Sequence, residues 1–74
     1  MKPRHDILSH LRRHRLRSDL TQQELAERVG VTRQTILSIE KGKYSPTVGL
    51  ALRLARALEV SVEELFELEG ENDD

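Results

Sequence analysis

The 74-residue sequence contains no cysteine and only two aromatic residues, Tyr44 and Phe66. Without cysteine there is no disulfide framework and no thiolate ligand for a metal. No apolar run approaches the roughly 20 residues that a membrane helix needs, and no apolar stretch typical of a secretory signal follows the first residues. We therefore expect a single small domain in the cytoplasm, with no membrane partner.

Basic residues are missing from the C-terminal end of the chain. Residues 57–74 carry eight acidic residues and no lysine or arginine. All twelve basic residues lie in residues 1–56, where only five acids oppose them, so this part has a net charge of +7. The overall charge of −1 therefore does not exclude a polyanion as partner, provided that the basic part faces it and the acidic end points away.

Helix signals recur along the chain. Thr21 with Glu24, and Ser61 with Glu64, have the spacing of capping boxes, and Thr32 and Thr47 are candidate N-caps. Apolar residues at helical spacing predict helices at about 5–17, 22–29, 33–41, 48–58 and 62–68. No segment shows the alternation of a strand, so the predicted class is all-α. We expect residues 1–69 to form the domain and residues 70–74 to form an acidic, disordered tail.

Each of these five helices has an apolar row, and together the rows define the predicted core. The row of the first helix consists of Ile7, Leu8, Leu11 and Leu16. The row of the fourth helix consists of Ala51, Leu54, Ala55 and Leu58, which follow the spacing i, i+3, i+4, i+7. Helices this short are not stable alone, so packing between them must hold the fold together.

The second and third predicted helices are separated only by Gly30, Val31 and Thr32. A three-residue turn with a glycine between two short helices is the helix-turn-helix arrangement. Gly30 takes a positive φ at little cost, and the small Ala26 lets the third helix approach closely. The pair of helices is therefore the strongest functional signal in the sequence.

A family resemblance is carried by two runs, LTQQELAERVGVTRQTILSIEKGKYSPT at residues 20–47 and ALRLARALEVSVEELF at residues 51–66. They resemble the Cro/phage-repressor-type helix-turn-helix family, also called the xenobiotic-response-element family. The resemblance covers roughly residues 7–67, with no gap through the motif. It implies a compact five-helix, lambda-repressor-like DNA-binding domain, usually dimeric, that regulates transcription. It also implies an ion pair between Arg15 and Glu40 and a phosphate contact for Gln22.

Three residues depart from the common pattern of this family. His14 stands where the first helix often has an apolar residue, Glu59 replaces a glycine that often ends the fourth helix, and Gly49 weakens the start of that helix. The turn at Glu59 then needs either a positive φ from a residue other than glycine or a different cap. These departures affect local stability and not the predicted fold.

The helix at 33–41 is the predicted recognition helix, whose first residues reach base edges in the major groove. Arg33, Gln34 and Ser38 would face outward, and Leu37 would touch a thymine methyl group. Arginine pairs bidentately with guanine, and glutamine with adenine. Phosphate contacts fix the register of a protein on the duplex, and the predicted ones are Thr21, Gln22, Thr32, Thr35, Lys41, Lys43 and Tyr44.

Several aliphatic residues fall outside the predicted core rows. We expect them to form a homodimer interface, and they are Leu50, Leu52, Val62 and Leu68. A two-fold dimer would place its recognition helices about 34 Å apart, on successive major grooves. The alternative is that these side chains are scattered on the surface, which is common.

His10 and His14 have the i, i+4 spacing at which two histidines can share a metal. No other segment supplies an obvious third ligand, so we expect both to face solvent or backbone. We expect no metal, no other cofactor and no small-molecule ligand. Arg53 and Arg56 are expected to be solvated.

The sequence thus predicts a DNA-binding transcriptional regulator, a repressor that binds an inverted-repeat operator as a homodimer. Within this class, two alternatives are a controller protein of a restriction–modification system and an antitoxin. From another class, the alternative is a protein-interaction module that keeps the fold without binding DNA. An enzyme is not expected, because the sequence has no cysteine, no nucleophile beside a histidine and no glycine-rich phosphate loop.

Overall fold

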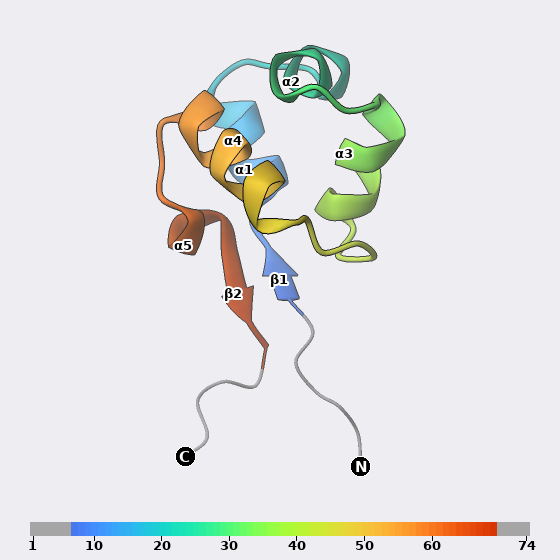
Figure 1. The fold of residues 1–74 in the computed structure, drawn as a ribbon. Helices are drawn as coiled ribbons and strands as arrows, with labels where there is room; N and C mark the ends of the chain where they lie inside the picture. Colours follow the sequence, from blue (N-terminus) through green and yellow to red (C-terminus); the bar gives the residue numbers. More distant parts are fainter. Residues whose placement is uncertain (1–6, 70–74) are drawn as a thin grey trace.

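Five helices and one two-stranded antiparallel sheet make up residues 7–69, the part of the chain that the computed structural model describes (Figure 1). In chain order the elements are β1 (Ile7–Ser9), α1 (Leu11–Arg17), α2 (Gln22–Val29), α3 (Arg33–Glu40), α4 (Val48–Leu58), α5 (Val62–Leu65) and β2 (Phe66–Leu68). The predicted five-helix, mostly helical fold with a helix-turn-helix is confirmed. The predicted tail at 70–74 lies outside the described residues.

The helix starts follow the predicted caps. Both capping boxes are present, at Thr21 and at Ser61. The side chains of Thr32 and Thr47 each accept a hydrogen bond from the backbone N–H three residues later. The backbone N–H of Ser61 donates to the Glu64 carboxylate at 2.7 Å, and this bond lowers the pKa of Glu64. Local hydrogen bonding therefore fixes where four of the five described helices begin.

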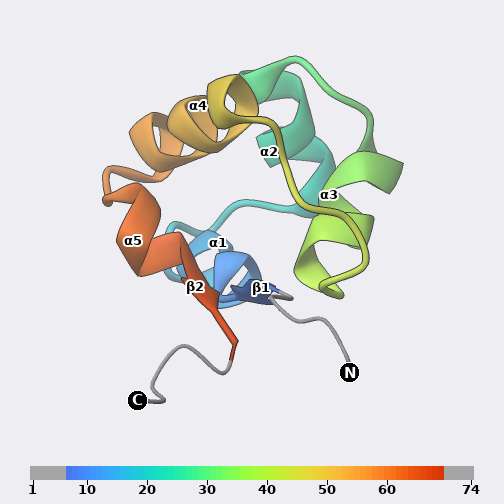
Figure 2. The same ribbon diagram turned by 60° about the horizontal axis from the view of Figure 1, so that its bottom comes forward.

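The small sheet corrects two predictions (Figures 1 and 2). Residues 7–9 are a strand and not the start of the first helix, and the last predicted helix ends at Leu65. The two strands pair in the register Ile7 with Leu68, Leu8 with Glu67, and Ser9 with Phe66. Phe66 is extended, with φ −137° and ψ 141°, so the chain leaves the helix and pairs with the distant β1. The expectation that the chain has no strand is wrong.

The core lies where the helices meet, and its largest fully buried side chains are Leu11, Leu25, Ile36, Ile39, Leu54 and Leu65. Three predicted positions are wrong. Leu8, in the predicted core row of the first helix, lies in β1 and is 42% exposed. Leu16 is 48% exposed, because α1 begins at Leu11 and buries the positions three and four residues further on. Leu50 is only 4% exposed, because it lies one turn before Leu54 on the buried face of α4.

Of the two surroundings expected for His14, solvent and backbone, the structure excludes solvent. His14 is only 7% exposed, on the buried face of α1. Arg15 beside it is equally buried. The first helix therefore buries two polar side chains, and one of them, Arg15, contacts Glu40 at the end of α3.

Glu59 ends α4 in the left-handed conformation, with φ 59° and ψ 43°. Since glycine adopts this conformation without a Cβ penalty, we expect Glu59→Gly to raise the free energy of unfolding by about 1 kcal/mol. Removing a carboxylate from the C-terminal end of a helix acts in the same direction. Thermal denaturation should show a melting temperature about 4–8 °C higher. The matched control Glu63→Gly, inside α5, should lower stability, and a fall in stability with Glu59→Gly would contradict the prediction.

Candidate nucleic-acid interface

The turn between α2 and α3 is fixed by the carbonyl of Ala26. The backbone N–H groups of Gly30 and Val31 donate to it, at 2.9 and 3.0 Å. Gly30 has φ 78°, the left-handed conformation that the sequence predicts for it. Ala26 is completely buried, so it leaves no space between the two helices for a larger side chain. The turn therefore sets the position of α3 against α2.

The helix α3 has one buried face and one outer face. Ile36 and Ile39 are buried in the core. Arg33 and Gln34, in the first turn, are exposed, and Leu37 and Ser38 are half-buried. The residues predicted to contact bases thus lie on the outer side, with the two long polar side chains at the start of the helix.

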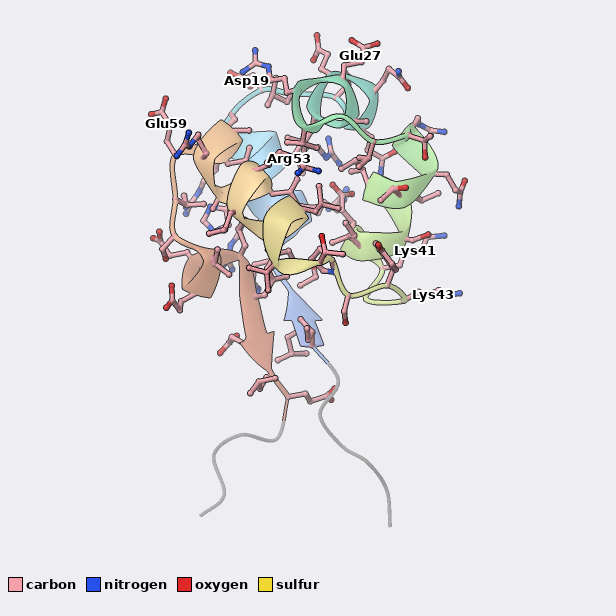
Figure 3. The ribbon with its side chains drawn as sticks, in the orientation of Figure 1. Asp19, Glu27, Lys41, Lys43, Arg53 and Glu59 are labelled. Atoms are coloured by element: carbon pink, nitrogen blue, oxygen red, sulfur yellow. The ribbon has the colours of Figure 1, made fainter. Side chains whose placement is uncertain are left out.

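A hollow joins the outer side of α3 to the loop that follows it. It is lined by Thr32, Gln34, Thr35, Ser38, Lys43 and Tyr44. These are six of the residues predicted to contact DNA, and they come together from the helix and from the loop. Lys41 and Lys43 lie at the C-terminal end of α3 (Figure 3), and Lys41, Arg33 and Leu37 do not line the hollow. Basic side chains therefore stand at both ends of α3.

Glu40, the last residue of α3, is held by two helices. Arg15 of α1 donates to it through Nε at 2.6 Å and through Nη2 at 3.2 Å. The side chains of the two residues are only 8% and 4% exposed. Arg15 also donates through Nη1 to the carbonyl of Leu20 at 2.9 Å. The structure thus places the two predicted partners in bidentate contact, a geometry that a single charged nitrogen could not reproduce.

Gln22 also contacts Glu40, so its side-chain amide is not free. Its side-chain Nε2 donates to Glu40 Oε1 at 3.0 Å. An amide nitrogen carries two N–H groups, so one remains for a phosphate. Thr21 lies beside it, with its hydroxyl accepting from the backbone of Glu24 at 3.0 Å. The first turn of α2 and the end of α3 are therefore linked through one carboxylate.

The predicted dimer residues divide into two groups. Leu50 is buried, so the prediction that it is exposed is wrong, and Val62 is half-buried against the core. Leu52 and Leu68 are 57% and 48% exposed. Of the four residues, only Leu52 and Leu68 are exposed.

Arg53 has a role that the sequence analysis missed. Its Nε donates to the carbonyl of Val29 at 3.0 Å, which ties α4 to the last turn of α2. Gly49 lies one turn earlier, and a Cβ there would be in ordinary van der Waals contact with Nη1, at 3.7 Å. No signal in the sequence identifies the contact between Arg53 and Val29.

Within residues 7–69 no group of three or more histidine, aspartate or glutamate side chains is arranged to hold a metal ion. In the same part of the chain, no helix has the length and apolar character needed to cross a membrane.

Comparison with known proteins identifies the family. A helix-turn-helix family pattern matches residues 11–65, which is most of the chain and includes the whole of α1 to α5. The chain belongs to the Cro/C1-type helix-turn-helix family. It is a transcriptional regulator of this family, and the family implies DNA binding.

Relatives of this Cro/C1-type regulator occur in archaea and bacteria. An uncharacterized HTH-type transcriptional regulator of Methanothermobacter thermautotrophicus is 58% identical over 60 residues, which cover 80% of this chain and 87% of the relative. The regulator YgzD of Bacillus subtilis, also uncharacterized, is 48% identical over 58 residues, 78% of this chain and 88% of YgzD.

Solved structures of Cro/C1-type proteins have the same fold. The restriction–modification controller protein C.AhdI from Aeromonas hydrophila is 34% identical, with a TM-score of 0.70 over 76% of this chain and 81% of C.AhdI. The similarity therefore extends over most of both chains.

Proposed function

We propose that this regulator is a repressor that binds an inverted-repeat DNA operator as a homodimer. The observation that carries the proposal is the outer side of α3, where exposed Arg33 and Gln34 stand beside a hollow lined by polar side chains. Lys41 and Lys43 extend the basic character to the other end of the helix (Figure 3). This arrangement suits a polyanion whose bases are read by one helix.

Each side chain has a defined part in this proposal. Arg33 donates two hydrogen bonds to guanine O6 and N7, and Gln34 pairs with adenine N6 and N7. Ser38 and Leu37 reach the next bases along the groove. Lys43, Tyr44 and the first turn of α2 hold phosphates, which fixes the register of α3 without reading sequence. Repression then follows from occupancy of the operator.

The homodimer follows from the need to read two half-sites. Two recognition helices about 34 Å apart meet successive major grooves on one face of the duplex. Leu52 and Leu68 provide exposed apolar surface for contact between copies.

A second candidate is a controller protein of a restriction–modification system. It is favoured by the similarity to C.AhdI, at 34% identity and a TM-score of 0.70. Both candidates bind DNA in the same way, and they differ in the genes that they control. Restriction and methylation genes next to the coding sequence would favour the controller.

The test is a selection of DNA sequences from a random pool, at about physiological salt. We expect enrichment of a palindrome whose half-sites are about one helical turn apart. Binding to it should weaken by about 10³–10⁵ between 50 and 200 mM salt if 6–10 phosphates are contacted. A folded protein that enriches no sequence would overturn the proposal and favour a protein-interaction module.

A further inference from the structure

The outer side of α4 carries a hollow that the proposed DNA contacts do not use. It is lined by Gly49, Leu52, Arg53 and Arg56. Within residues 7–69, the only ion pairs are Arg15 with Glu40 and His10 with Glu67. Arg53 and Arg56 therefore have no described carboxylate partner. In Figure 3, Arg53 lies over α4, whereas Lys41 and Lys43 lie at the end of α3.

The hollow combines an aliphatic side chain with a positioned guanidinium. Leu52 is 57% exposed and forms its apolar part. Arg53 is held by the bond from Nε to the carbonyl of Val29, and its Nη1 lies over Gly49. Arg56, which lines the same hollow, supplies a second guanidinium that can bind a carboxylate. The matching ligand therefore presents an aliphatic group and a carboxylate side by side.

The sheet of β1 and β2 presents that pair of groups. Leu8 and Glu67 are directly opposite in the register, so their side chains lie on the same face. Ile7, Phe66 and Leu68 lie on the other face, where Phe66 packs against the core, so docking through the outer face uses Leu8 in place of Leu68. Leu8 is 42% exposed, and the Glu67 side chain is 57% exposed. His10 Nε2 contacts one oxygen of Glu67 at 2.6 Å, which leaves the other oxygen available.

We propose that the outer face of this sheet docks into the α4 hollow of a second copy of the chain. Leu8 packs on Leu52, and Glu67 pairs with Arg56 beside Arg53. Because a two-fold interface makes each contact twice, the partner's sheet fills the first copy's hollow in the same way. Burial of the outer face in the dimer adds to the packing of the inner face on the core. The inference rests on the proposed homodimer and names its interface.

The residues that line the hollow favour a second copy of the chain over a nucleic acid as the ligand. Phosphate contacts use backbone N–H groups and short polar side chains as well as basic ones. Apart from the two arginines, the hollow is lined by a glycine and a leucine. It is therefore suited to an aliphatic side chain next to one carboxylate, and both are present on this chain.

The test exchanges the charges across the interface in the full chain. Arg56→Glu and Glu67→Arg each place like charges together twice in the dimer, so each should raise the dimer Kd by about 100-fold in sedimentation equilibrium. A chain with both substitutions restores opposite charges and should recover a Kd within about threefold of the original. Arg12→Glu, which makes the same charge change at an exposed position of α1, should leave the Kd nearly unchanged.

Two further variants separate docking from local effects. His10→Ala removes the histidine contact of Glu67 and keeps its carboxylate, so it should not reproduce the effect of Glu67→Arg. Leu52→Ala should weaken the dimer while the circular dichroism spectrum stays that of the folded chain. This interface is wrong if neither single charge reversal raises the dimer Kd, or if the doubly substituted chain does not regain the original Kd. Either result would leave the proposed homodimer itself unaffected. An original chain that stays monomeric even on its operator overturns the homodimer itself.

Discussion

Replacing Glu40 by alanine should lower the free energy of unfolding by about 3–5 kcal/mol. The substitution leaves the guanidinium of Arg15 buried without its carboxylate, and the amide of Gln22 loses its acceptor. A domain of this size has a total stability on the order of 5–10 kcal/mol, so the loss is a large fraction of it. Thermal denaturation should show a melting temperature on the order of 20 °C lower.

Glu27→Ala is the matched control for this substitution. Glu27 is an exposed helical carboxylate whose side chain contacts Gln23 at 3.0 Å. Its removal should change stability by less than about 0.5 kcal/mol. If Glu40→Ala and Glu27→Ala melt at the same temperature, the buried pair does not stabilise the fold.

Arg33→Ala and Gln34→Ala should each weaken operator binding by roughly 30-fold to 10⁴-fold. A bidentate contact contributes about 1–3 kcal/mol of discrimination, and a two-fold operator contains it twice. Both side chains are exposed, so these variants should fold and melt as the original chain does. A repeated DNA selection should show that each variant loses its preference at one base of each half-site.

Lys43→Ala and Arg28→Ala serve as controls with different expected behaviour. Lys43 lines the hollow beside α3, so its loss should weaken binding to all sequences equally and reduce the salt dependence by about two phosphates, one for each copy in the dimer. Arg28 is an exposed arginine of the last turn of α2 and should have little effect. An unchanged selected sequence with Arg33→Ala would show that this arginine does not read a base.

Local signals in the sequence predict where most of the helices begin and where the turn between α2 and α3 lies. Thr21 and Ser61 mark helix starts because the capping hydrogen bonds are made within three residues. Gly30 marks the turn, since its left-handed φ is favoured in glycine. The side chains at the start of α3 are exposed because the buried face of α3 is set by Ile36 and Ile39.

What the sequence did not predict depends on contacts between distant residues. Three-residue strands are too short to show an alternating pattern, and Ile7 pairs with Leu68 across almost the whole chain. The apolar row predicted for the fourth helix begins at Ala51 and therefore leaves out Leu50, which lies one turn from Leu54 on the same face. The contact between Arg53 and Val29 involves a backbone carbonyl, which leaves no mark on residue choice at that position.

Glu40 lies at the end of α3 that holds the fold together, away from the side chains proposed to read DNA. Its contacts with Arg15 and Gln22 lie at the end of the helix, whereas Arg33 and Gln34 stand at the start and contribute nothing to them. Exchanging the outer side chains of α3 therefore leaves the scaffold intact. Operator preference should thus be transplantable, so that a relative given the outer residues of this helix acquires its target sequence without being redesigned elsewhere.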